Sequence, residues 1–111
     1  MVTSKPTLRK PKIPHPGDLL KTIRRLVDEG KVRHTVHVVE DSMPDRGLDF
    51  DDLETILRKG IIREKIRPGK NLGEWKCLVE DKLPGNSRWT GVAVVVKESH
   101  LLIATIEWVD P

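Results

Sequence analysis

Cationic side chains gather in the second half of the chain, on segments predicted to be neighbouring strands and turns. They are Lys65, Arg67, Lys70, Lys76 and Arg88. Lysines and arginines that share a surface can bind the phosphate backbone of a nucleic acid. Glu64, Glu74 and Glu80 lie in the same stretch, and ion pairs with them would leave an ordinary solvated surface. The pattern therefore predicts either an RNA-binding patch or a set of exposed ion pairs.

Two histidines, His34 and His37, have side chains that can exchange protons near neutral pH. They are candidates for RNA contacts or for acid and base in RNA cleavage. On a strand, however, residues three apart face opposite sides, which favours a surface or core-edge role. A zinc site that adds Glu40 would need a helix here and a fourth ligand. We therefore expect no metal and no other cofactor.

The three tryptophans and the single cysteine are better explained by packing. Trp75, Trp89 and Trp108 can stack on bases, but the chain has only one phenylalanine, so we expect at least two of them in the core. Cys77 alternates with Lys76 and shares a strand face with Trp75, which favours burial over a reactive thiol. One cysteine excludes an internal disulfide and fits a reducing compartment.

Two helices and a short strand are predicted before residue 60. Apolar residues from Leu19 to Val27 follow a helical period, and Gly30 can end that helix. Residues 31–38 alternate like a half-buried strand, whose end can instead become a short helix stopped by Pro44 and Gly47. A second long helix is predicted over Phe50–Lys59, with a cap at Asp49, a buried stripe that begins at Phe50, and a stop at Gly60.

After Gly60 the apolar period changes from 3.6 to 2, and three turn clusters divide the remainder. We expect antiparallel strands over residues 61–67, 74–80, 88–96 and 101–108, joined by hairpins. The helices would cover one face of this sheet. Residues 17–111 are thus predicted to be one α+β domain.

The first sixteen residues are predicted to be a flexible basic arm. Lys5, Arg9, Lys10 and Lys12 lie there without an acidic residue, among half of the eight prolines. The arm could screen RNA phosphates, rest on an acidic partner, or be a solvated terminus without a ligand. The longest apolar run, Val92–Val96, is too short to span a bilayer, and no signal peptide is recognisable, so we expect a cytoplasmic protein.

Several segments resemble the RelE-like toxins of bacterial toxin–antitoxin pairs, and most closely the motility quorum-sensing regulator toxins. The resembling segments are residues 26–35 and 47–51, Trp75, and residues 101–105, within a match over roughly residues 18 to 108. Residues 43–47, Met-Pro-Asp-Arg-Gly, are also similar to a Met-x-x-Arg-Gly signature of small bacterial domains. The resemblance implies N-terminal helices packed on a mainly antiparallel sheet of four to five strands.

The resemblance also implies an activity, which is ribosome-independent cleavage of messenger RNA by attack of a 2′-hydroxyl, without a metal. Its catalytic lysine after the second helix falls on Arg63 or Lys65, and the residue after the tryptophan is Lys76. The family's tyrosine is replaced by Val92 or Ala93, and its final lysine by Glu107 or Trp108.

The resemblance thus makes Arg63, Lys65 and Lys76 the candidate catalytic residues. The candidate RNA contacts are Arg67, Lys70, Arg88, His34 and His37. A cognate antitoxin would be the protein partner, and the chain would be a monomer or weak dimer. Because the catalytic set is incomplete, the alternative is a non-catalytic module that binds RNA or a partner protein.

Overall fold

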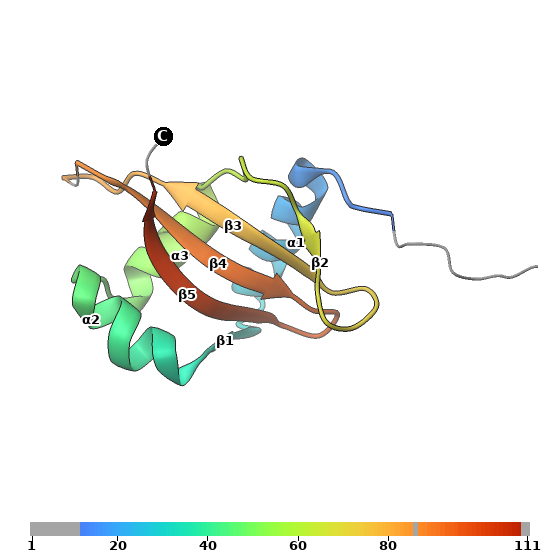
Figure 1. Cartoon of the computed structure of the whole chain (residues 1–111), viewed down its shortest axis with the longest axis horizontal. Coiled ribbons are helices and arrows are strands. Elements are labelled where there is room, and N and C mark those ends of the chain that lie inside the picture. Colours follow the sequence, from blue (N-terminus) through green and yellow to red (C-terminus); the bar gives the residue numbers. More distant parts are fainter. Residues whose placement is uncertain (1–11, 86, 110–111) are drawn as a thin grey trace, which may run out of the picture.

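The structure is a computed structural model that describes residues 12–85 and 87–109 (Figure 1). Its elements, in chain order, are α1 (Pro16–Asp28), β1 (Val32–His34), the π-helical turn η1 (Val38–Ser42), α2 (Met43–Arg46), α3 (Phe50–Lys59), β2 (Arg67–Pro68), β3 (Trp75–Asp81), β4 (Trp89–Val96) and β5 (Leu101–Val109). Residues 1–11 of the predicted arm lie outside the described residues. The α+β class predicted from the sequence is confirmed.

The strands form one mixed five-stranded sheet in the order β1-β5-β4-β3-β2. The hairpins β3–β4 and β4–β5 are antiparallel, as predicted, and β2 is antiparallel to β3. β1 instead runs parallel to β5, with Val32 opposite Leu101 and His34 opposite Ile103. The first strand of the domain therefore borders the last one.

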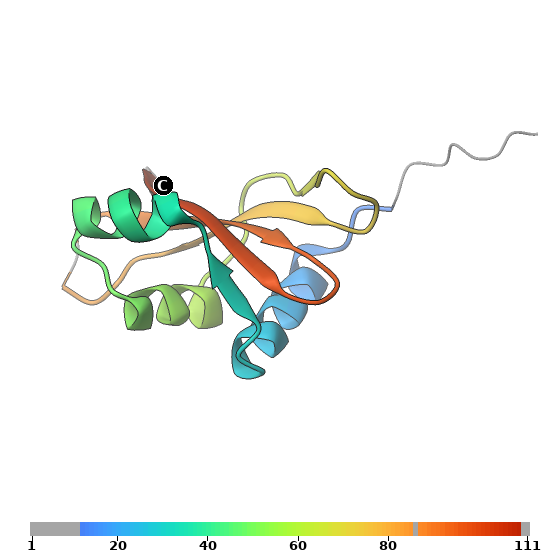
Figure 2. The same ribbon diagram turned by 90° about the horizontal axis from the view of Figure 1, so that it is seen from below.

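Helices α1 and α3 pack on the same face of the sheet, behind it in Figure 1 and below it in Figure 2. We call this the covered face. Its strand residues are buried in the hydrophobic core: Cys77, Val79, Val92, Val94, Ile103 and Ile106. The helices contribute Leu19, Ile23, Leu26, Leu53, Ile56 and Leu57 to the same core. Their apolar stripes follow the helical period, as predicted.

In the described residues no long helix covers the other side of β3, β4 and β5, which we call the open face. Because side chains alternate along a strand, the cross-strand pairs Lys76–Val95, Leu78–Ala93, Val95–Leu102 and Gly91–Glu107 all belong to this face. A bulge at Ala93/Val94 leaves Ala104 unpaired in the register, so the core-facing residues of β5 are Leu101 and Ile103 before it and Ile106 after it.

The segment between α3 and β2 is not the strand predicted over residues 61–67. Ile61 bridges to Glu80 and Arg67 pairs with Lys76, so six steps along this segment must span four steps along β3. The two extra residues force the chain out of the sheet. Buried Ile66 holds the loop on the core, whereas Arg63 in the same loop is exposed.

The strand predicted over residues 31–38 ends early, and the alternative of a short helix is confirmed. Thr35 causes the change: its hydroxyl donates to the carbonyl of Ala104 at 3.1 Å and accepts the N–H of Val38 at 3.2 Å. The helix ends at Gly47, whose φ of 64° is left-handed. Pro44 does not stop it, because proline fits the first turn of α2.

Both long helices begin at identifiable caps. α1 begins at Pro16, inside the predicted arm, because proline suits the first turn and the ring of His15 accepts the N–H of Gly17. α3 begins with the predicted cap at Asp49, whose side chain and that of Asp52 bond each other's backbone N–H groups. Phe50, predicted to be buried, is 49% exposed.

Candidate nucleic-acid interface

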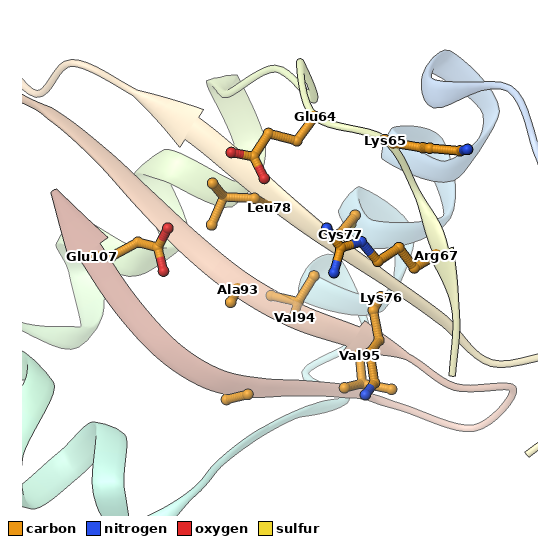
Figure 3. A pocket seen from close by; sticks show the side chains of 11 residues that line it. Glu64, Lys65, Arg67, Lys76, Cys77, Leu78, Ala93, Val94, Val95 and Glu107 are labelled. Atoms are coloured by element: carbon orange, nitrogen blue, oxygen red, sulfur yellow. The ribbon is translucent and has the colours of Figure 1, made fainter. Parts of the chain in front are cut away.

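A shallow pocket of about 320 Å³ lies on the open face, between the loop before β2 and strand β5 (Figure 3). Its floor is apolar and comes from neighbouring strands: Leu78, Ala93, Val95 and Ala104. Its charged lining residues are Glu64, Lys65, Arg67, Lys76 and Glu107. The sheet therefore brings together side chains that lie up to 43 residues apart in sequence, from Glu64 to Glu107.

Arg67 and Lys76 are the cations that the strand register places together. They are direct partners across β2 and β3, a pairing continued by Pro68 opposite Trp75. Both side chains are exposed. Among the residues that the structure describes, no carboxylate forms an ion pair with either of them. Their two positive charges are therefore available to an anionic ligand.

The predicted neutralisation of these cations by nearby glutamates is not what the structure shows. Glu74 pairs with Lys97 at 3.1 Å, and Glu80 pairs with Arg63. A side-chain hydrogen bond from Asn71, followed by one from Lys97, lowers the pKa of Glu74. Glu74 and Glu80 therefore bind cations other than Arg67 and Lys76.

Two carboxylates enter the pocket from opposite sides. In Figure 3 the side chains of Glu64 and Glu107 point toward one another across Leu78 and Ala93. Sequence reasoning treated Glu64 only as a partner for nearby cations and Glu107 only as a position where a lysine is missing. Strict alternation from Leu101 and Ile103 would have put Glu107 on the covered face; the bulge at Ala93/Val94 moves it to the open face, opposite Gly91, and the sequence alone did not reveal that bulge.

The two lysines predicted to be catalytic do not converge. Lys65 lines the rim of the pocket, but Figure 3 shows its side chain extending away from the other lining residues. Lys76 extends over the sheet toward Val95. Arg67, predicted only as an RNA contact, points over β3 and lines the pocket.

Arg63, the third predicted catalytic residue, is held at the other end of the open face. Its Nε donates to Oε1 of Glu80 at 3.1 Å, and its terminal nitrogen bonds the same oxygen. The centre of the guanidinium lies 4.8 Å from the ring centroid of Trp89. Arg63 is therefore anchored outside the pocket.

Arg88 and Lys70 also lie outside the pocket lining. The guanidinium of Arg88 lies 4.7 Å from the ring centroid of Trp108, and that of Arg46 lies 5.9 Å from it. Lys70 is exposed in the turn before β3. The expectation of two tryptophans in the core is wrong: Trp75, Trp89 and Trp108 are all partly exposed, because arginines rather than core side chains cover two of them.

The histidines lie away from this pocket. His34 is between β1 and α3 on the covered side, where its ring meets Phe50 edge-on at 4.7 Å, and burial lowers its pKa. His37 is exposed on the next helical turn, with Nδ1 3.2 Å from Asp41. In residues 12–85 and 87–109 no group of three or more histidines, cysteines or acids is placed to hold a metal.

Cys77 is buried, as predicted from its strand face. Burial raises the pKa of its thiol to about 12, so the group stays protonated near neutral pH. It supplies packing rather than a nucleophile.

A comparison with protein-family models finds no match for this chain, and a comparison with curated proteins finds no relative. The resemblance to RelE-like toxins therefore stays a prediction based on the segments quoted above. No helix in the described part of the chain is long and apolar enough to cross a membrane.

Proposed function

We propose that this chain is a RelE-like, toxin-type domain that binds the phosphate backbone of RNA on its open face. The observation that carries the proposal is the pair of cations, Arg67 and Lys76, which face each other across β2 and β3 without a carboxylate partner in the described residues. Arginine and lysine are the side chains that contact phosphates most often. A partly exposed apolar floor beside them offers a surface for sugars and bases.

Cleavage of the bound RNA is a second proposed function, and the carboxylate of Glu64, three residues before Arg67 in the sequence, favours it. Glu64 would accept the proton of a 2′-hydroxyl, whose oxygen attacks the adjacent phosphorus. The bond from phosphorus to the 5′-oxygen then breaks, and Lys76 would donate a proton to that oxygen. Arg67 would stabilise the charge on the phosphoryl oxygens. The products would be a 2′,3′-cyclic phosphate and a free 5′-hydroxyl.

The binding proposal is tested with a charge-matched pair of variants. Fluorescence anisotropy with a single-stranded RNA oligonucleotide would be measured for the wild type, for Arg67→Ala/Lys76→Ala, and for Lys21→Ala/Lys59→Ala. Lys21 and Lys59 are exposed on α1 and α3, on the covered side. We expect the first variant to lose about tenfold or more in affinity and the second to bind like the wild type. Equal loss in both would mean that net charge, and not the open face, attracts the RNA.

The cleavage proposal is tested by the products. Incubation with RNA in the presence of a chelator should yield fragments with 2′,3′-cyclic phosphate ends, and Glu64→Gln should reduce their formation while binding persists. If the wild type binds RNA without cleaving it, the alternative of a non-catalytic RNA-binding module remains. Absence of RNA binding would overturn both proposals and favour the partner-protein alternative, such as an antitoxin.

A further inference from the structure

Arg63 and Trp89 lie against each other at the end of the open face opposite Arg67 and Lys76. Trp89 belongs to the open face because it alternates in step with Gly91, Ala93 and Val95 along β4. The guanidinium of Arg63 lies over its ring at 4.8 Å. Trp89 covers one side of that cation, and 36% of the Arg63 side chain is exposed.

Glu80 fixes this guanidinium in place. Its side chain is 1% exposed and accepts two N–H groups of Arg63, from Nε and from a terminal nitrogen. A carboxylate so deeply buried is stable only with its cation, so the pairing holds Arg63 where it is. A planar cation that is already immobilised loses little conformational entropy when another flat group stacks on it.

Between its two ends the open face has side chains that lie close to the sheet, and acidic residues flank this part. Lys76 and Glu80 are four residue steps apart along β3, which is about 13 Å. A Cβ at Gly91 would lie 2.9 Å from Cδ1 of Leu78, so glycine there lets Leu78 lie flat against the sheet. Glu64 and Glu107 flank this part.

The acids decide which part of an RNA strand can reach Arg63. A phosphate lying further along, between Glu64 and Glu107, would be repelled, so the backbone is held at Arg67 and Lys76 and only a 2′-hydroxyl reaches Glu64. The group that extends to Arg63 is then an uncharged one. In RNA that group is a base, whose flat face suits a guanidinium.

We propose that an unpaired nucleobase stacks on the exposed side of the Arg63 guanidinium, with Trp89 on the other side. This inference rests on the proposed RNA binding and specifies its ligand as single-stranded RNA. In a duplex both faces of a base are already covered by its neighbours, so the site cannot receive it without unstacking. The aromatic side chain of a partner protein is the competing occupant.

The test uses octamer RNAs that each lack one base but keep every phosphate. For the wild type, we expect at least one of these abasic octamers to bind about fivefold or more weakly than the intact octamer. The intact RNA should also change the tryptophan fluorescence. Arg63→Lys keeps a cation beside Glu80 but lacks the planar guanidinium, so this variant should bind the intact and the abasic octamers with equal affinity. Arg58→Lys, on α3, is the control and should discriminate like the wild type.

Each outcome separates this inference from the proposed function. If the wild type binds every abasic octamer as tightly as the intact one, no base is stacked and the inference fails even if Arg63→Lys does not fold. If Arg63→Lys still discriminates, the base stacks elsewhere. If Arg67→Ala/Lys76→Ala retains full affinity, the proposed phosphate site fails instead. If none of the RNAs binds, both fail and a protein partner becomes the occupant to seek.

Discussion

The two faces of the sheet differ in the work that their side chains do. On the covered face Val92, Val94 and Ile103 are at most 2% exposed and pack against α1 and α3. On the open face the neighbouring residues Val95 and Leu102 are only partly buried, and exposed charged groups border them. Adjacent residues of one strand thus serve different purposes: one face supplies stability, and the other is free to bind a ligand.

The largest expected effect comes from comparing two single substitutions at adjacent residues of β5, one on each face of the sheet. Ile103→Ala removes a side chain that is 1% exposed, and we expect a loss of about 2–5 kcal/mol in the free energy of unfolding. Leu102→Ala removes a partly exposed side chain of the same size and should cost about 1 kcal/mol or less. Urea denaturation measures both values. Similar losses would show that the open face is packed as tightly as the covered one.

A second substitution breaks the buried ion pair on the open face. Arg63→Ala leaves the carboxylate of Glu80, which is 1% exposed, without its cation. We expect a loss of about 1–3 kcal/mol, because an unpaired buried acceptor keeps its full desolvation cost. Lys65→Ala, two residues along the same loop, should stay within about 0.5 kcal/mol of the wild type. If both variants melt alike, Glu80 does not depend on Arg63.

The covered face also predicts how stability changes with alkaline pH. The pKa of Cys77 is raised from 9.0 to about 12 in the folded protein, so the folded state keeps a proton that the unfolded state releases. This stabilising contribution is complete below pH 9 and is lost as the pH rises from 9 to 12. At pH 10 the wild type should have lost about 1 kcal/mol more than Cys77→Ala. If the free energy of unfolding changes with pH in the same way for the two proteins, the thiol is accessible to water.

The smallest expected effect is on His34, at the edge of the covered side. Burial lowers its pKa, so its ring should titrate below 6.5 when followed by proton NMR. Because the folded state prefers the neutral ring, His34 stabilises the protein above pH 6.5 and loses that contribution as the pH falls. Phe50→Ala removes the edge-on ring and should move the midpoint toward 6.5. An unchanged midpoint would assign the burial to other neighbours.

Local signals predicted most of the fold. The cap at Asp49, the stripe from Leu19 to Val27 and the strands β3 to β5 with their hairpins are indicated by short stretches, and the structure confirms each of them. Alternation does not hold through β5, where a bulge shifts the buried positions from Leu101 and Ile103 to Ile106. Residues 61–66 were predicted to be part of a strand, but they form a loop because this segment has two more residues than the part of β3 opposite it. Alternation within the segment does not reveal that mismatch. The parallel pairing of β1 with β5 is likewise a long-range contact.

The candidate site was predicted only in part, for a similar reason. Strand alternation placed Lys76 on a polar face, and the register then adds Arg67 as its partner. Alternation could not show that the Lys65 side chain extends away from the pocket. Nor could it show that Arg63 and Arg88 lie over tryptophans, because those contacts join separate elements. Opposite charges close in sequence were expected to pair, yet Glu64 lines the pocket instead.

The salt dependence of RNA affinity tests the role of the open face most directly. For single strands, the slope of log affinity against log salt changes by about 0.7 for each phosphate contact. The slope for Arg67→Ala/Lys76→Ala should therefore be shallower than that of the wild type by about 1.4, whereas Lys21→Ala/Lys59→Ala should keep the wild-type slope. Identical slopes in all three proteins would contradict phosphate binding by the open face.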